Sequence, residues 1–320
     1  MQVIKTLAFK FRPAKDLLLL DQTLLPKKKA FIPIENPKHI TRAIKALKVR
    51  GANLIGVTAG FSLAQYAFKN PKAKNLKSLA KQLSLARPTA VHLSQAVQKV
   101  MKQKSPSAKL NQAIALYEED KKACESMAKK ARPLIKTGDG ILTYCNTGCL
   151  ATAGIGTALG AIKQAFQDKK QIHVFVCETR PLNQGSRLTF WELNQEKIPC
   201  SLICDNMTAH LMSQKKIQKV FVGADRISKN GDTANKIGTY NLAVISHHFK
   251  IPFYVVAPSN TIDSQSQTGQ KIPIEQRAGK EISSYWAKHK TNIINPSFDV
   301  TPRHLITKII TEKGYYIDRI

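Results

Sequence analysis

The sequence has few aromatic residues, few acidic residues and no long apolar run. Aromatic side chains make up 7% of its 320 residues, and only two of these residues are Trp. No stretch approaches the ~20 consecutive apolar residues of a membrane-spanning helix, so we expect no membrane partner. The N-terminal stretch MQVIKTLAFKFRPAKDLLLL lacks the small-residue cleavage site of a secretory signal. These absences predict a globular protein of the cytoplasm.

The shortage of acidic residues gives the chain a strong positive charge. Asp and Glu number 21 against 50 Lys and Arg, for a net charge of +29. An excess of this kind is typical of nucleic-acid-binding proteins. Here the lysines are scattered in small groups such as 27–29 and 215–216, and no aromatic residues alternate with them as a stacking surface requires. We therefore interpret them as a solvated surface and expect no nucleic acid as partner. An RNA-binding protein remains an alternative.

The usual metal and nucleotide motifs are also missing. The six cysteines include two C-x3-C spacings, at 145/149 and 200/204, without the tighter C-x2-C turn or a nearby His pair of a zinc site. The segment 154–160 (GIGTALG) contains G-x-G but not the complete dinucleotide motif, and no phosphate-binding P-loop is present. We therefore expect no metal, no cofactor, and reduced thiols.

The order of the apolar segments predicts an α/β protein of two domains. Residues 38–120 show mainly helical periodicity. Beyond residue 138, short apolar segments that we interpret as strands lie at 141–145, 172–177, 200–204, 219–223 and 252–257. Helical patterns separate them at 151–167, 185–196, 207–214 and 235–249. This alternation is typical of a doubly wound parallel sheet. We predict a mainly helical domain over 1–121, a Rossmann-like domain over 122–320, and a Pro-led helix in the tail after residue 295.

A polar loop follows every predicted strand. In open parallel sheets ligands bind beyond the carboxyl ends of the strands, so these loops are the expected site. Cys145 lies at the end of the first strand, before small residues that we predict to begin a helix, and helix N-termini lower the pKa of a thiol. Asp225 follows a later strand directly. A buried apolar role for Cys145 and a capping role for Asp225 are the structural alternatives.

Arginine is rare beside lysine, and the arginines lie in tight stretches rich in Gly and Pro. Arginine binds phosphate and carboxylate groups through two parallel hydrogen bonds. We expect some of these residues to bind an anionic ligand and others to form structural ion pairs: Arg50, Arg87, Arg180, Arg187 and Arg226. The segment 231–240 (GDTANKIGTY) combines a turn, an amide and a lysine, which fits phosphate binding.

Motifs along nearly the whole chain resemble the methylthioribose-1-phosphate isomerase family. They include KVRGANLIGVTAG, ILTYCNTGCLATAGIGTALGAI, ETRPLNQGSRLTFWEL, CDNMTAHLM, VGADRISKNGDTANKIGTYNLAV and NPSFDVTPRHL. This family also includes regulatory subunits of the translation-initiation nucleotide exchange factor. The resemblance implies a helical domain followed by a Rossmann-like domain, a homodimer, and conversion of 5-methylthioribose 1-phosphate to 5-methylthioribulose 1-phosphate in methionine salvage. It further implies that Cys145 and Asp225 are catalytic. The implied substrate contacts are Arg50, Gly51, Ala52, Arg87, Gln184, Asn235 and Lys236.

The chain departs from the family pattern at two motifs. The isomerases usually have RGAP where Asn53 stands, and THCNAG where Tyr144 and Thr147 stand. These departures leave the 5-substituent of the substrate open, so isomerases of ribose 1,5-bisphosphate or 5-deoxyribose 1-phosphate are alternatives. A non-enzymatic regulatory protein is a further one, although such relatives generally lack the Cys and the Asp.

Overall fold

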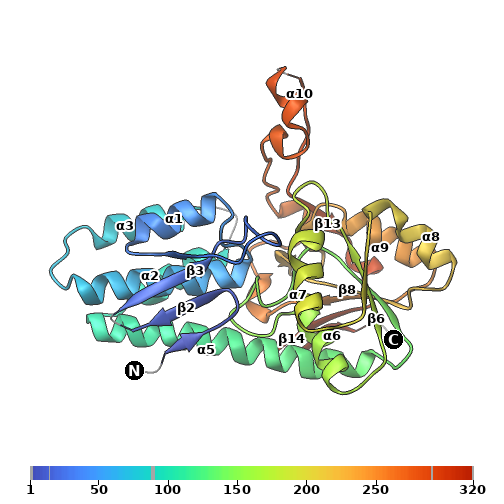
Figure 1. Ribbon diagram of the computed structural model, residues 1–320, viewed down its shortest axis with the longest axis horizontal. Helices are drawn as coiled ribbons and strands as arrows, with labels where there is room; N and C mark the ends of the chain where they lie inside the picture. The colour runs from blue at the N-terminus through green and yellow to red at the C-terminus, as the bar shows by residue number, and fades with distance from the viewer. Residues whose placement is uncertain (1–2, 14, 88–90, 290, 319–320) are drawn as a thin grey trace. The chain divides into compact units, whose positions relative to one another are not determined.

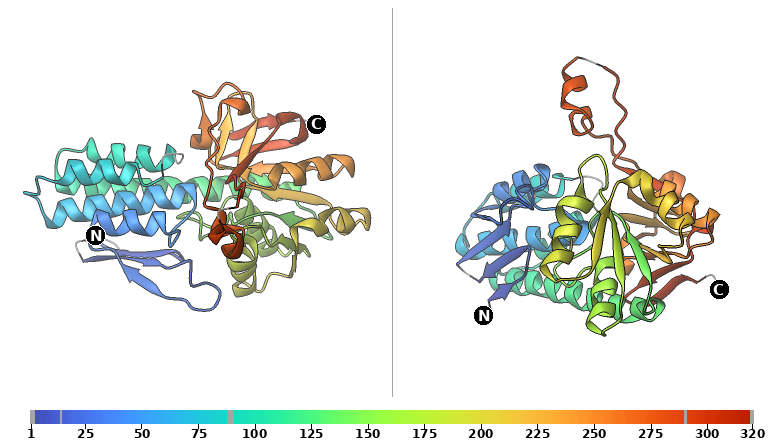
Figure 2. Two further views of the ribbon diagram at one scale, coloured as in Figure 1. Left: turned by 90° about the horizontal axis from the view of Figure 1, so that it is seen from above. Right: turned by 45° about the vertical axis from the view of Figure 1, so that its right-hand side comes forward.

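The computed structural model describes residues 3–13, 15–87, 91–289 and 291–318, in two compact units (Figures 1 and 2). The N-terminal unit comprises residues 1–125 with 148–156, and the C-terminal unit comprises 126–147 with 157–320. The chain passes from the first to the second within helix α5 (Pro106–Ala131). The domain boundary at 121/122 stays a prediction.

The N-terminal unit contains an antiparallel sheet that the sequence reasoning missed. Its strands lie in the order β1 (Ile4–Lys5), β2 (Phe9–Arg12), β3 (Asp16–Leu20) and β4 (Phe31–Pro33). Alternate residues of β2 are buried, and the rings of Phe9 and Phe11 lie 5.6 and 4.2 Å from that of Phe61 in helix α2. The sheet therefore packs its apolar face on the helices.

Helices form the remainder of that unit, as predicted for residues 38–120. They are α1 (Pro37–Lys45), α2 (Ala52–Lys69), α3 (Leu76–Ser84), α4 (Val91–Met101) and the first part of α5. Helix α2 is buried on all sides from Leu54 to Ala64, because its residues there are small or apolar. Among the described residues, no helix is both long and apolar enough to span a membrane.

A seven-stranded sheet forms the centre of the C-terminal unit and confirms all five predicted strands. Its strand order is β15-β14-β11-β8-β5-β6-β7, and every pair is parallel except β14 with β15. The strands are β5 (Gly140–Thr143), β6 (His173–Cys177), β7 (Cys200–Ile203), β8 (Lys219–Val222), β11 (Phe253–Val256), β14 (Lys308–Thr311) and β15 (Gly314–Asp318). The Rossmann-like prediction is thus confirmed.

The helices of this unit are shorter than the sequence predicts. They are α6 (Ala158–Gln167), α7 (Phe190–Gln195) after a π-helical turn η2 (Gly185–Thr189), α8 (Thr208–Ser213) and α9 (Thr239–His248). Residues 235–236 belong to a second sheet, ordered β12 (Ile262–Asp263), β9 (Arg226–Ser228), β10 (Thr233–Lys236) and β13 (Phe298–Thr301). The prediction of a helix in the tail is wrong, because β13, β14 and β15 occupy it and only the short 3-10 helix η7 (Arg303–Leu305) follows Pro302. β13 and β14 pair with strands far away in sequence, and β15 pairs with the neighbouring β14.

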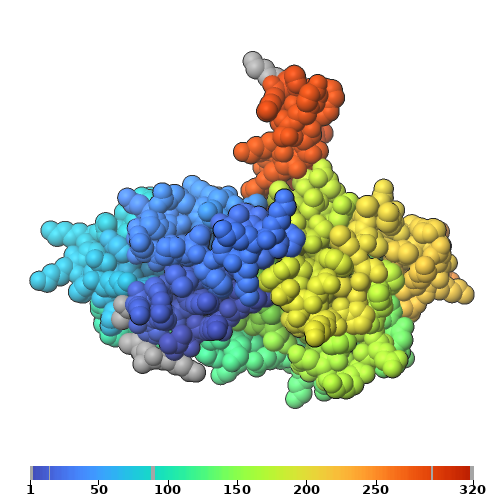
Figure 3. Space-filling model, in the orientation of Figure 1, coloured from blue at the N-terminus to red at the C-terminus, as the bar shows by residue number. Residues whose placement is uncertain are grey.

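An arm over residues 276–296 projects from the C-terminal unit (Figures 1 and 3). Its base is held by a bridge between Gln276 and Pro296 and by the ion pairs of Arg277 with Glu275 and Glu281. Near its tip, the short helix α10 (Ser284–Lys288) exposes the rings of Tyr285 and Trp286.

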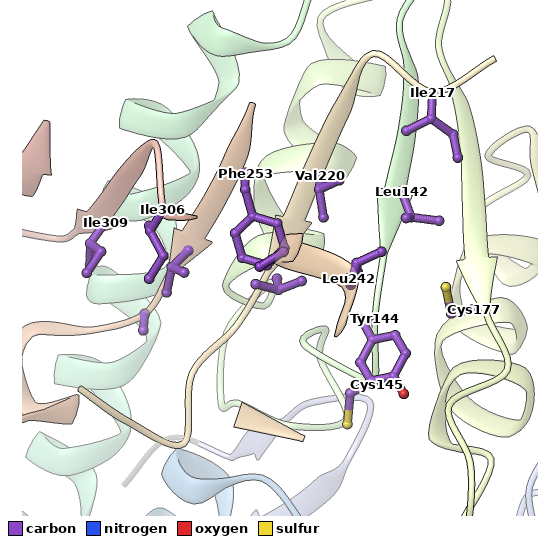
Figure 4. Packing of buried hydrophobic residues seen from close by; sticks show 14 of the residues in the cluster. Leu142, Tyr144, Cys145, Cys177, Ile217, Val220, Leu242, Phe253, Ile306 and Ile309 are labelled. Carbon is purple, nitrogen blue, oxygen red and sulfur yellow. The ribbon is translucent and has the colours of Figure 1, made fainter. Parts of the chain in front are cut away.

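The core of the C-terminal unit extends to the carboxyl ends of the central strands. Leu142, Val220 and Phe253, from three adjacent strands, belong to one buried apolar cluster (Figure 4). Tyr144 and Cys145 form the end of the same cluster. The residues that follow β5 are therefore fixed by core packing.

Two glycines with nearly the same positive φ predict a difference in stability. Gly51 has φ of 91°, and an added Cβ would overlap the backbone of Ala151, lying 2.5 Å from its Cα. Gly138 has φ of 89°, with nothing within 4 Å of an added Cβ. We expect Gly51→Ala to lower the free energy of unfolding by at least about 2 kcal/mol. Gly138→Ala, as the matched control, should cost only about 1 kcal/mol of backbone strain. Equal losses in urea unfolding would contradict the packing explanation.

Candidate active site

The strand order of the main sheet reverses between β5 and β8. From β5 the chain adds β6 and β7 on one side, and then returns to place β8, β11 and β14 on the other. Ligands of open parallel sheets bind at such a reversal, beyond the carboxyl ends of the two strands. Cys145 follows β5 and Asp225 follows β8, so the two predicted catalytic residues flank this position. The two loops approach closely, since a Cβ on Gly223 would lie 2.8 Å from Thr147 Cγ2.

Cys145 is buried and has an unusual backbone conformation. It is 7% exposed and has φ of 60°, in the left-handed region. Its N–H donates to Thr179 Oγ1 at 2.9 Å, and its carbonyl oxygen accepts from Thr189 Oγ1 at 2.5 Å. These contacts come from the residues after β6 and from the turn η2.

The prediction that a helix starts directly after Cys145 is wrong. Residues 146–157 form turns, and α6 begins only at Ala158. Gly156 has φ of 105°, which a helix excludes, and Thr147 Oγ1 accepts the N–H of Leu159 at 3.0 Å. The first turn of α6 therefore donates a hydrogen bond to Thr147, and the helix does not start at Cys145. Residues 148–156 pack in the N-terminal unit.

The loop after β8 fixes the backbone of Asp225 and leaves its side chain half-buried. The N–H of Asp225 donates to the carbonyl of Ala234 at 2.9 Å, and Arg226 forms an ion pair with Asp263 at 3.2 Å. Asp205, which follows β7, has a structural role. Its carboxylate accepts hydrogen bonds from the backbone N–H groups of Thr179 and Arg180 at 2.8 and 2.7 Å.

Gln184 contributes a buried polar atom to the loop after β6. Its side chain is 6% exposed, and its Oε1 has no hydrogen-bond partner among the described residues. A buried carbonyl oxygen of this kind favours a ligand that donates a hydrogen bond, such as a sugar hydroxyl. Arg187 donates to the carbonyl of Leu182 at 3.2 Å, which braces the same loop.

Asn235 and Lys236 lie on β10 and are both buried. Asn235 Nδ2 donates to Thr239 Oγ1 at 3.0 Å, and Lys236 Nζ donates to the carbonyl of Ser297 at 2.9 Å. Asp299, which pairs with Asn235 across the sheet, accepts the N–H of Gly238 at 2.7 Å. Burial raises the pKa of Asp299 to about 6. The sequence analysis did not predict Asp299 as a site residue. Its only signal there was an acidic residue between two apolar ones, in the segment SFDVT (297–301).

Tyr144, one of the three residues that depart from the family motifs, has a structural partner. Its hydroxyl donates to the carbonyl of Ile237 at 2.9 Å, and burial raises its pKa. A Cβ on Gly238 would overlap that hydroxyl, so glycine is required where Tyr144 packs. The loop after β5 is thereby joined to the turn after β10.

The remaining predicted contacts lie in the N-terminal unit. Arg50 and Gly51 precede α2, Ala52 is its first residue, and Arg87 follows α3. Within this unit the segment 148–156 reaches the start of α2, where the N–H of Leu54 donates to the carbonyl of Ala151 at 3.2 Å.

Asn53 also has a structural partner in the N-terminal unit. Its amide donates to Asp120, whose other oxygen accepts the N–H of Ala153 at 2.6 Å. The side chain of Asn53, at the position where the family has proline, therefore helps to join α2, α5 and the segment 148–156. Among the described residues, no group of three or more His, Cys, Asp or Glu is placed to bind a metal.

Comparisons with known proteins show which family the chain belongs to. The family described as "Initiation factor 2 subunit family" matches residues 48–317. Methylthioribose-1-phosphate isomerase of Klebsiella pneumoniae is 43% identical over 98% of this chain and 95% of its own length. That of Desulforamulus reducens is 43% identical over 93% and 92%.

Two solved structures have the same fold over nearly the full length. The 5-methylthioribose 1-phosphate isomerase of Pyrococcus horikoshii has a TM-score of 0.88 at 34% identity, covering 97% of this chain and 92% of that one. Translation initiation factor eIF-2B subunit delta from A. fulgidus has a TM-score of 0.82 at 36% identity, covering 97% and 96%.

The buried carboxyl group of Asp120 predicts a pH dependence of stability. Burial raises its pKa from 3.8 to about 6, and the hydrogen bonds from Ala153 and Asn53 oppose the rise. Between these two values only the folded state holds the proton, so the stability contributed by Asp120 falls as the pH rises from 4 to above 6. Asp120→Asn does not titrate, so it should not lose this stability. We expect its free energy of unfolding to rise by on the order of 2–3 kcal/mol, relative to that of the unsubstituted protein, as the pH rises from 4 to 7. Urea unfolding at several pH values would measure this, and a constant difference would contradict it.

Proposed function

The chain belongs to the initiation factor 2 subunit family and, within it, to the methylthioribose-1-phosphate isomerases. We propose that it is an aldose–ketose isomerase, which converts 5-methylthioribose 1-phosphate to 5-methylthioribulose 1-phosphate in methionine salvage. The observation that carries the proposal is the pair Cys145 and Asp225 at the reversal of strand order, where sheets of this kind bind ligands.

The chemistry follows from the phosphate on C1 of the sugar. This substrate has no free anomeric hydroxyl, so the ring opening of ordinary aldoses is blocked. Asp225 donates a proton to the ring oxygen as the bond from that oxygen to C1 breaks. Cys145 removes the proton from C2, which gives an enol that still bears the phosphate, and returns a proton to C1. The C2 hydroxyl gives its proton to the carboxylate that Asp225 became in the first step, which restores the acid, and the C2 oxygen becomes the ketone.

A hydride shift from C2 to C1 is the alternative route, and the fate of the C2 hydrogen distinguishes the two. Turnover in deuterated water introduces deuterium at C1 if Cys145 exchanges its proton with solvent. Full retention of the original hydrogen at C1 favours the hydride shift. In either route the substrate contacts that the resemblance implies include the positive charges of Arg50, Arg87 and Lys236 and the residues Gly51 and Ala52.

The 5-substituent is proposed to be methylthio, by similarity to relatives of that name. A panel of substrates with methylthio, hydrogen or phosphate at the 5-position, with the ketose 1-phosphate detected as product, tests this assignment. A non-enzymatic regulatory role is the second candidate, and the similarity to translation initiation factor eIF-2B subunit delta favours it. Absence of turnover with the whole panel would support that second candidate.

The protein is further proposed to be a cytoplasmic homodimer, as the resemblance implies. The aromatic rings exposed on the projecting arm support an association between protein chains. Light scattering combined with size-exclusion chromatography tests this proposal, and a mass of one chain at micromolar concentration would refute it.

The catalytic assignment predicts a selective loss of turnover. We expect Cys145→Ser and Asp225→Asn each to lower kcat by at least about 10³-fold, because each removes the group that transfers a proton. Cys204→Ser is the matched control, since Cys204 also follows a strand of the sheet and is half-buried, and it should keep normal kcat. Steady-state kinetics with circular dichroism as a folding check measure both. Near-normal turnover of Cys145→Ser would refute the scheme.

The buried oxygen of Gln184 predicts a contact with substrate. We expect Gln184→Ala to lower kcat/KM by about 10-fold, since one hydrogen bond to a sugar hydroxyl is lost. Gln171→Ala serves as the control and should not change kcat/KM, because Gln171 is exposed and precedes β6, at the amino ends of the strands. If both variants behave alike, the proposed contact is wrong.

A further inference from the structure

The backbone conformation of Cys145 requires support from its surroundings. Its φ of 60° lies in the left-handed region, where the Cβ of an ordinary residue crowds the following carbonyl oxygen. Asparagine, aspartate and glycine adopt this region readily, whereas cysteine does not. The direction in which the thiol projects is set by this conformation, so any relaxation of the backbone moves Sγ.

Two threonine hydroxyls hold the peptide groups on either side of the Cα of Cys145. Thr179 Oγ1 accepts the N–H of Cys145 and donates its own proton to the carbonyl of Cys177 at 3.1 Å. Thr189 Oγ1 donates its proton to the carbonyl of Cys145. Both threonines are at most 1% exposed, so water does not compete for these bonds. Each hydroxyl has one proton, and both protons are committed.

A chain of buried polar groups continues from Thr189. Asn146 Nδ2 donates to Thr189 Oγ1 at 3.3 Å and to Glu192 Oε1 at 2.8 Å. Glu192 Oε2 in turn accepts from Lys163 Nζ at 3.1 Å, and the two side chains are 0% and 3% exposed. Because α6 carries Lys163 and α7 carries Glu192, this ion pair ties the Cys145 loop to two helices.

We infer that Thr179 and Thr189 are positioning residues of the reaction, which hold Cys145 in the left-handed conformation that directs its thiol. The buried pair Glu192–Lys163 fixes Thr189 through Asn146. This inference rests on the proposed catalytic role of Cys145. It assigns no proton transfer to the threonines themselves.

The test compares valine with serine at each position. Thr189→Val and Thr179→Val keep the shape of the side chain and remove the hydroxyl, whereas Thr189→Ser and Thr179→Ser retain it. We expect each valine variant to lower kcat about 10- to 100-fold, the effect of a displacement of about 1 Å at a reacting group, with KM within about twofold. The serine variants should keep kcat within about threefold of the unsubstituted enzyme.

A second readout is independent of turnover. The rate of alkylation by iodoacetamide, followed by mass spectrometry of the peptide that contains Cys145, should change at least threefold in the valine variants. The rate at Cys204 serves as an internal control and should stay constant. In the unsubstituted protein the amide of Cys145 should exchange its hydrogen slowly, because it donates to a buried hydroxyl.

The outcomes separate the two proposals. Valine variants with normal kcat and normal alkylation at Cys145, or serine variants as impaired as the valine ones, would overturn the inference. If the valine variants do not fold, hydrogen exchange in the unsubstituted protein decides. Exchange at the amide of Cys145 as fast as at exposed loop amides would overturn the inference, and slow exchange would support it. Normal turnover of Cys145→Ala would refute the proposed function, while alkylation and hydrogen exchange would still decide the role of the threonines.

Discussion

The parallel pairing of β5 with β8 is the constraint on which the candidate site depends. The register joins Leu142 with Val220 and Thr143 with Phe221, so the two strands end at nearly the same level. Neighbouring strands lie about 4.8 Å apart, and the groups that follow them are therefore close in space. The pairing itself is stabilised by the apolar side chains of the central strands, which are almost completely buried. Core packing thus supports the chemistry directly.

The loops at this edge are held by hydrogen bonds to one another rather than by regular structure. Asp205 after β7 accepts from the backbone after β6, and Thr179 after β6 accepts from Cys145 after β5. Tyr144 donates to Ile237 in the turn after β10. The ends of β5, β6 and β7 are thereby fixed by one another, and a substitution in one loop affects the geometry of the next.

Family membership accounts for the fold but not for the activity. Relatives named as isomerases and relatives named as initiation factor subunits match this chain over nearly its full length. The fold therefore permits both an enzyme and a regulatory subunit, and it does not by itself decide between them. The three residues that depart from the isomerase motifs, Asn53, Tyr144 and Thr147, have hydrogen-bond partners inside the protein, which explains them structurally.

The sequence by itself determined the parallel sheet, its first five strands, and the loops in which the candidate site lies. Short apolar runs encode such strands locally, and polar residues follow them directly. Only the tertiary structure decided the conformation of Cys145, the strands of the tail and the buried carboxyl of Asp299. Thr179 and Thr189 are 34 and 44 residues from Cys145, and β14 pairs with β11 across more than 50 residues. No local pattern records a hydrogen bond between residues so far apart, because its partner is present only once the chain has folded.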